Sequence, residues 1–255
     1  MLMPALNEEA RIEASVSAAL AIPQVDEVIV IDDGSVDETG DLAAKAGAEV
    51  IRLQRNLGKG GALNAGLRRA RGDVILTLDA DLGLSAIEGA KLLAPVLAGQ
   101  AHMTVGVFPR LGKGGGFGLA KGLAKRGILL LTGQQLREPL SGQRCLLREI
   151  LDRCNGFAAG FGAEVGLTID ALRLGYRVLE VEVNMDHART GRNLTGFRHR
   201  GRRSTPASTR PGRHRSAMPR NRQRPGGGTS ASERRPAAAR LPRRGRPSAG
   251  RGRGR

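Results

Sequence analysis

Short apolar runs alternate with helical patterns along the first half of the chain, and this alternation constrains the fold more than any other feature. The apolar runs predict strands over 27–32, 49–53, 74–79 and 102–107. The segments between them predict helices over 8–20, 37–46, 61–71 and 85–97. Regular alternation of this kind is typical of a mainly parallel sheet with helices on both faces. The sequence therefore predicts an α/β fold with a mainly parallel, open sheet flanked by helices.

The pattern loosens after residue 108. The glycine-rich run 112–118 favours a loop or lid, although its glycines could also cradle a phosphate. Beyond it we expect a helix that ends near residue 131, a second helix over 165–174 and a last strand over 177–183.

Carboxylates follow two of the predicted strands directly. Asp79 and Asp81 stand where the apolar run 74–78 ends, and Asp32 and Asp33 follow the run 28–31. Open α/β sheets bind their ligands at the carboxyl ends of the strands. Hard oxygen ligands there suit Mg²⁺ or Mn²⁺ held against a diphosphate. A single Asp-x-Asp pair is common in solvated turns, but two acidic strand ends favour one concerted site.

Four motifs occur in a fixed order, namely PALNEE at 4–9, DDGSVDET at 32–39, NLGKGGALNAG at 56–66 and DAD at 79–81. In this order they resemble the family 2 glycosyltransferases of the GT-A fold. Within that family the chain is most similar to the branch of dolichyl-phosphate and polyprenyl-phosphate sugar transferases. The resemblance covers residues 1–197 and implies a GT-A, nucleotide-diphospho-sugar transferase domain.

The resemblance also implies where the nucleotide-sugar donor binds, through Pro4, Ala5, Asn7, Glu8 and Asp33. From the residues alone, Asn7 could instead cap the helix expected to begin at residue 8. The neighbour of Asp33, Asp32, could merely close its strand.

Charged side chains complete the implied donor and metal sites. Lys59 lies among glycines before a helix amino end and would contact phosphate, although it could be an ordinary loop lysine. The resemblance makes Asp81 the main ligand of Mg²⁺ or Mn²⁺, with Asp79 on the metal or the ribose and His187 as third ligand. Arg189, in the run 189–192, would offer a further seat for an anion.

Two residues concern the acceptor. Glu164 would take the acceptor's proton in an inverting displacement, or it could simply interact with a helix dipole as an acid at the amino end. Arg144 would hold an anionic acceptor or the donor diphosphate, the alternative being a solvated charge at a strand end.

The net charge of +17 belongs to the carboxyl-terminal part of the chain. Residues 198–255 hold 19 Arg against one acid, a charge of +18, whereas residues 1–197 carry a charge of −1. Such a composition predicts a disordered tail. It could bind polyanions such as anionic lipid headgroups, be a solvated extension, or be out-of-frame translation, which we favour because the change near residue 200 is abrupt. No aromatic residue separates the arginines, so we expect nucleic acid to bind only non-specifically.

Several absences narrow the expectation further. Two cysteines without zinc spacing predict reduced thiols in a cytoplasmic protein. No apolar run approaches the ~20 residues of a membrane span, and no signal peptide is apparent. A lipid acceptor would thus be met at the inner membrane face. Only residues 1–3 precede the first motif, so we expect a clipped first strand that is a weak sheet member.

The expected function is metal-dependent, inverting transfer of a sugar from UDP-glucose to a polyprenyl phosphate. We expect this reaction to take part in building the cell envelope. A sugar-nucleotide nucleotidyltransferase is the alternative enzyme, but its glycine-rich turn with an arginine is missing after the first strand. A non-enzymatic polyanion-binding protein, acting through the arginine-rich tail, is the alternative of another class.

Overall fold

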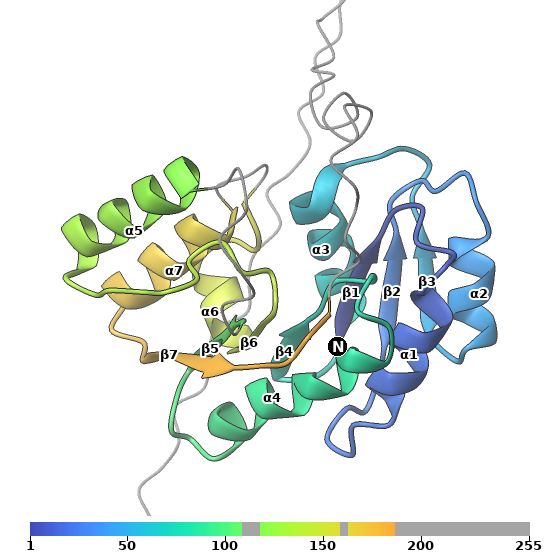
Figure 1. Cartoon of the computed structure of the whole chain (residues 1–255), viewed down its shortest axis with the longest axis horizontal. Coiled ribbons are helices and arrows are strands. Elements are labelled where there is room, and N and C mark those ends of the chain that lie inside the picture. The colour runs from blue at the N-terminus through green and yellow to red at the C-terminus, as the bar shows by residue number, and fades with distance from the viewer. Residues whose placement is uncertain (109–117, 159–162, 187–255) are drawn as a thin grey trace, which may run out of the picture. The chain divides into compact units, whose positions relative to one another are not determined.

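The computed structural model describes residues 1–108, 118–158 and 163–186. Within these ranges seven strands form one sheet, in the order β3-β2-β1-β4-β6-β5-β7 (Figure 1). The strands are β1 Leu2–Ala5, β2 Ile29–Asp32, β3 Glu49–Arg52, β4 Val74–Thr77, β5 Met103–Val107, β6 Arg144–Leu147 and β7 Val178–Glu182. The predicted α/β fold, with a mainly parallel sheet, is confirmed.

Helices connect the strands and cover both faces of the sheet. They are α1 Ile12–Leu20, α2 Thr39–Lys45, α3 Gly58–Arg69, the 3₁₀-helix η1 Gly83–Glu88, α4 Gly89–Leu97, α5 Gly118–Thr132, α6 Arg148–Arg153 and α7 Ala163–Arg173. No helix in the described ranges is both long and apolar enough to cross a bilayer.

Two hydrophobic clusters, one on each face, hold the layers together. Met3 and Ala5 of β1 pack with buried residues of α1, α2 and α4. Leu2, which points to the opposite face, packs with buried residues of α3, α5, α6 and α7. Alternate residues of one strand thus serve two cores, as the period of two in a strand requires.

The first strand differs from the expectation. β1 is a central strand, parallel to both β2 and β4, and Leu2 and Met3 are 0% exposed. The prediction of a weak sheet member was wrong because Pro4 and Ala5 extend the strand and because it has a partner on either side.

β6 runs antiparallel to both of its neighbours, β4 and β5, while the other ladders are parallel. The turn that enters β6 therefore reaches the same edge of the sheet as the loops that leave β1, β2 and β4. Chain segments from four parts of the sequence meet at this edge.

Most predicted elements exist with shifted ends. α1 begins at Ile12 rather than residue 8, and the strand expected over 74–79 ends at Thr77, so Asp79 lies in the following loop. The helix expected over 85–97 is divided into η1 and α4. The tail from residue 198 and the glycine-rich run at 112–117 lie outside the described residues.

Candidate functional site

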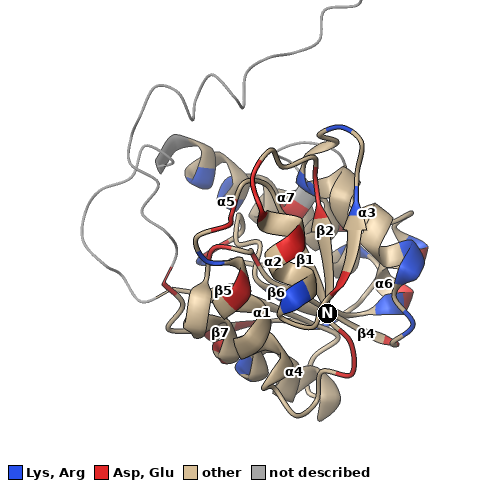
Figure 2. Cartoon of the chain, turned by 90° about the vertical axis from the view of Figure 1, so that its right-hand side faces the viewer, with Lys and Arg blue, Asp and Glu red and all other residues tan. Residues whose placement is uncertain are grey.

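The candidate site lies at the carboxyl edge of β1, β2 and β4, where the notable acidic residues of the sequence gather. Acidic segments lie around the ends of β2 and α2 (Figure 2). The amino ends of α3 and α7 and the turn before β6 supply the remaining side chains. Both the donor-side and the acceptor-side predictions therefore concern one edge of the sheet.

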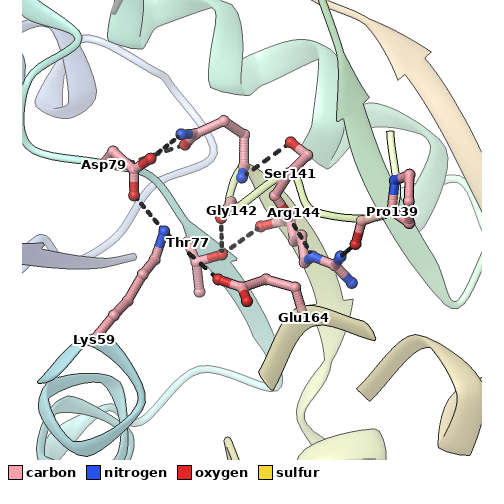
Figure 3. Close-up of polar contacts among 9 residues, drawn as sticks. Lys59, Thr77, Asp79, Pro139, Ser141, Gly142, Arg144 and Glu164 are labelled. Atoms are coloured by element: carbon pink, nitrogen blue, oxygen red, sulfur yellow. Dashed lines mark hydrogen bonds and ion pairs between the residues drawn. The ribbon is translucent and has the colours of Figure 1, made fainter. Parts of the chain in front are cut away.

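Asp79 contacts side chains from two other segments of this edge, Lys59 of α3 and Gln143 before β6 (Figure 3). Its Oδ1 accepts a hydrogen bond from Lys59 Nζ at 2.5 Å. Its Oδ2 accepts one from Gln143 Nε2 at 2.6 Å, and its backbone N–H donates to Gln143 Oε1 at 3.0 Å. These contacts fix both the backbone and the carboxylate of Asp79.

Lys59 stands between two carboxylates. Its Nζ lies 4.0 Å from Glu164 Oε1, on the side away from its contact with Asp79. The three side chains come from α3, from the loop after β4 and from the first turn of α7. The structure thus brings together Lys59, Asp79 and Glu164, although Lys59 and Glu164 lie more than 100 residues apart in the sequence.

Asp33 organises the start of the helix that carries Lys59. Its two carboxylate oxygens accept the backbone N–H groups of Leu57, at 2.7 Å, and Gly58, at 2.9 Å. Burial is the first cause that raises the pKa of Asp33, while these two amide hydrogen bonds oppose the rise. Asp33 therefore acts through the start of α3, and its predicted contact with the nucleotide stays a prediction.

Asp32 makes one contact of the kind that its plainer alternative implies. Its Oδ1 accepts the N–H of Ser35 at 2.8 Å, which closes the turn after β2.

Asn7 links the loop after β1 to the loop after β2. Its φ of 56° is left-handed, a conformation that Asn tolerates better than most residues. Its Oδ1 accepts the N–H of Val36 at 2.9 Å, and its own N–H donates to Ser35 Oγ at 3.0 Å. Because α1 begins at Ile12, Asn7 is not its N-cap, and that alternative was wrong.

The pKa of Glu8, the next residue, responds to burial and to the negative charge around it. Its pKa is raised to about 7, first by burial and then by repulsion from Asp81, Asp79 and Asp37. The backbone N–H of Glu8 is held by Thr39 Oγ1 at 2.8 Å. Burial is the larger cause of this shift, but the repulsion from three neighbouring carboxylates is an excess of negative charge that favours a cation.

The donor set suits a Mg²⁺ or Mn²⁺ ion shared with a ligand. In the described part of the chain no three acidic, His or Cys side chains are arranged to hold a metal ion. Mg²⁺, however, usually takes one or two protein carboxylates and completes its shell with water and substrate phosphates. Asp79 and Asp81 fit that requirement. The predicted third ligand, His187, and the predicted anion contact, Arg189, lie outside the described residues.

Arg144 is not at the site, which corrects the expectation that it binds an acceptor or a diphosphate. Its side chain is buried, with 2% of the residue exposed, at the start of β6. The guanidinium donates to Ser141 O at 2.8 Å, Thr168 Oγ1 at 2.7 Å and Pro139 O at 3.0 Å. The prediction failed because β6 is an interior strand, so its first residue enters the core and is not solvated.

Gln143, which holds Asp79, had no predicted role. The sequence places it in a short polar run before an apolar segment, and this pattern carries no sign of an antiparallel strand. The reversal of β6 is what brings Gln143 to the carboxyl end of β4.

Comparison with known proteins adds an independent observation. A family model described as glycosyl transferase family 2 matches residues 1–161. The chain is 33% identical over 211 residues to glucosyl-3-phosphoglycerate synthase of Mycobacterium tuberculosis, covering 72% of this chain and 64% of that protein. It is 30% identical over 212 residues to undecaprenyl-phosphate 4-deoxy-4-formamido-L-arabinose transferase of Aeromonas hydrophila, covering 78% and 63%. The chain thus spans a little under two thirds of the length of these relatives.

Solved structures show the same likeness. The fold matches glucosyl-3-phosphoglycerate synthase from M. tuberculosis in complex with Mn²⁺, UDP-glucose and phosphoglyceric acid, with a TM-score of 0.64 and 32% identity, over 77% of this chain and 72% of that one. The complex of the same protein with Mg²⁺ and UDP also gives a TM-score of 0.64, with 31% identity, over 77% and 72%. The predicted GT-A architecture is confirmed.

Proposed function

This chain belongs to glycosyl transferase family 2, and we propose that it transfers glucose from UDP-glucose to an acceptor that bears a phosphate group. The single observation that carries the proposal is the joint placement of Lys59, Asp79 and Glu164 at the carboxyl edge of the sheet. We assign the activity to a domain of residues 1–197. The tail from residue 198 has no part in the proposal.

The donor side of the proposal rests on the loops after β1 and β2 and on the start of α3. Pro4, Ala5, Asn7, Glu8 and Asp33 would form the seat of the nucleotide, as the motif order implies. Lys59 stands at the amino end of α3, where backbone N–H groups and an ammonium can meet phosphate oxygens. UDP-glucose is the first donor to test because the similar mycobacterial structure was solved with it.

Asp79 and Asp81 would hold a Mg²⁺ or Mn²⁺ ion, which when bound offsets the charge that develops on the departing diphosphate. The carboxylates that raise the pKa of Glu8 supply the negative field that such an ion needs. His187 as a further ligand and Arg189 as an anion contact complete the proposal.

In the proposed reaction an acceptor oxygen forms a bond to the anomeric carbon of glucose while the bond from that carbon to the diphosphate breaks. UDP leaves with the electron pair of the broken bond. If the acceptor is a hydroxyl, its proton passes to the carboxylate of Glu164. If the acceptor is a phosphate oxygen, it is already ionised and no proton has to pass to Glu164. The inverting course implied by the motifs is part of this proposal.

Two acceptors that bear a phosphate group fit the proposal. Phosphoglyceric acid is the first, because the similar mycobacterial structure holds it and because that relative is named for a phosphoglycerate product. Polyprenyl phosphate, the acceptor favoured by the motifs, is the second, and an undecaprenyl-phosphate transferase is among the relatives. Only the second would require work at the inner membrane face and a role in the cell envelope.

A donor and acceptor screen tests the proposal. The purified full chain is given UDP-glucose or another nucleotide sugar, with phosphoglyceric acid or with polyprenyl phosphate in detergent, and UDP release is followed with Mn²⁺ or with EDTA. We expect acceptor-dependent release from UDP-glucose that EDTA abolishes. Proton NMR of the product reports whether the anomeric configuration is inverted. Absence of acceptor-dependent release from every donor would refute the proposed function.

A further inference from the structure

Arg144 is a buried cation whose hydrogen bonds all go to uncharged oxygens. It is the largest of the fully buried side chains in the described ranges, and Nε, Nη1 and Nη2 each have an acceptor. Desolvation lowers the pKa of the guanidinium to about 10, while the negative charge of Glu164 opposes that shift. Burying a charge without an ion pair is costly, which is a reason to ask what this residue does for the site.

The acceptors of Arg144 belong to two separate segments. Pro139 and Ser141 lie in the turn before β6, and Thr168 lies in α7. Thr168 Oγ1, which accepts from the guanidinium, itself donates to the backbone carbonyl of Glu164 at 2.7 Å. A continuous chain of hydrogen bonds therefore runs from the turn, through Arg144 and Thr168, to the backbone of Glu164. Figure 3 shows its first part, the contacts of Arg144 with the turn.

The same turn also controls the opposite side of the site. Gln143, the residue before Arg144, holds the backbone N–H and the carboxylate of Asp79. The side chains of these two consecutive residues thus bond to different segments: Gln143 to the loop after β4, and Arg144 to α7. The two segments that they hold carry the carboxylates on either side of Lys59.

We infer that Arg144 is a positioning residue, which acts through Thr168 to set Glu164 at its distance from Lys59 and Asp79. The inference rests on the proposed function, in which Glu164 faces the acceptor. Arg144 itself would touch neither donor nor acceptor. Its loss should therefore change the turnover of bound substrate and leave the affinity for the donor intact.

Thr168→Val is the sharpest test, because it keeps the shape of the side chain and removes the hydroxyl that links Arg144 to Glu164. Thr168→Ser keeps the hydroxyl and should restore the link. Thr132→Val is the matched control, since Thr132 Oγ1 makes the same bond to a carbonyl four residues earlier, at 2.7 Å to Ile128 O, and no guanidinium donates to it in the described structure.

For Thr168→Val we expect kcat to fall roughly 10- to 100-fold, in line with the cost of a small misplacement in an active site. The Kd of UDP with Mn²⁺ should stay within about twofold, as in other cases where only transition-state interactions are lost. Thr168→Ser and Thr132→Val should keep the wild-type kcat. A Thr168→Val enzyme that melts at a lower temperature but retains the wild-type kcat would overturn the inference and leave Arg144 a purely structural residue.

Amide hydrogen exchange separates this inference from the proposed function. If the wild-type chain binds UDP and Mn²⁺ but transfers no sugar, the proposed function fails. Even then, Thr168→Val should speed exchange at the start of α7, at the amides of residues 167 and 168, which bond to carbonyls one turn earlier, and leave α1 unchanged. Wild-type protection of these amides in the variant would refute the positioning role whether or not the chain is active.

Discussion

Gln143 holds Asp79 at two points, accepting the backbone N–H at 3.0 Å and donating to the carboxylate Oδ2 at 2.6 Å. Gln143 is almost fully buried, with 1% of the residue exposed, so water cannot readily replace either contact. The orientation of a residue that the motifs assign to the donor therefore depends on a residue outside every motif.

Gln143→Leu should weaken donor binding. The variant removes the Gln143 acceptor of the Asp79 N–H and the donor to its Oδ2, and leaves the carboxylate with its Lys59 contact, so we expect the affinity for UDP with Mn²⁺ to fall by at least about tenfold. The free energy of unfolding should fall by about 1–3 kcal/mol, the usual cost of an unsatisfied buried polar group. Calorimetry and denaturant unfolding measure the two effects. Gln134→Leu, at an exposed position, is the control, and an unchanged UDP affinity in Gln143→Leu would contradict the assignment.

Asp81→Ala should abolish the Mn²⁺-dependent part of UDP binding while the fold stays intact. Asp81 lies in the loop beyond β4 and not in either hydrophobic cluster, so its loss removes a ligand rather than core packing. Titration calorimetry with UDP and Mn²⁺ reports the binding. Asp73→Ala, next to the opposite end of β4, should bind like the wild type. Wild-type affinity in Asp81→Ala would eliminate this residue as a metal ligand.

Glu164→Gln should distinguish the two acceptors. With a hydroxyl acceptor such as phosphoglyceric acid, loss of the base should lower kcat by roughly 10²–10⁴-fold. With polyprenyl phosphate, whose attacking oxygen is already ionised, the loss should stay under about tenfold. Initial rates with each acceptor, at saturating UDP-glucose, give the comparison. A near-wild-type rate on a hydroxyl acceptor would show that Glu164 is not the base.

Glu8 should make stability depend on pH in the neutral range. Its pKa in the folded chain is about 7, above the ordinary value of 4.5, so the folded chain holds this proton more tightly than the unfolded chain. The stabilisation from protonated Glu8 is therefore complete below about pH 4.5 and is lost as the pH rises to about 7. Glu8→Gln, which stays neutral, should melt like the wild type at pH 4.5 and at a higher temperature than the wild type at pH 8. If Glu8→Gln and the wild type have equal melting temperatures at pH 8 as well as at pH 4.5, the raised pKa of Glu8 is contradicted.

The arginine-rich tail should be dispensable for catalysis. Residues 198–255 carry 19 Arg and almost no large apolar side chain, so they can contribute little to a core. A chain that ends at residue 197 should keep the turnover and melting temperature of the full chain, and heparin binding should disappear with the tail. Loss of turnover on truncation would show that the tail belongs to the enzyme.

The sequence was sufficient to predict the class of the sheet and the edge that carries the site. Each apolar run predicts a strand, and the Asp32 and Asp79 carboxylates that follow mark the edge of the sheet where that strand ends. Both can be read from the sequence because each strand and its carboxylates are contiguous in the chain. Lys59 and Glu164 could likewise be proposed from motifs and a helix amino end. Their mutual distance could not, since it depends on how α3 and α7 pack.

The wrong prediction for Arg144 and the missed role of Gln143 have one physical cause. Arg144 reads as a solvated charge, and Gln143 as an ordinary polar residue, as long as the direction and depth of β6 are unknown. Pairing of β6 between β4 and β5 is a long-range contact that no local pattern encodes. The same reasoning applies to β1, whose short apolar segment gains its stability from neighbours on both sides.

Because β6 runs in the opposite direction, the residues proposed for the donor and those proposed for the acceptor come from separate parts of the sequence. Residues proposed for the donor follow the ends of β1, β2 and β4, within the first third of the chain, whereas the turn at 139–143 enters the same edge from the opposite direction, ahead of its strand. Under the proposed function, substitutions in α7 would act on the acceptor side, whereas those in the turn would also reach the donor side, because Gln143 holds Asp79. Gln143 and Arg144 are the positions of this turn where substitution is least free, because one holds the loop after β4 and the other bonds to α7.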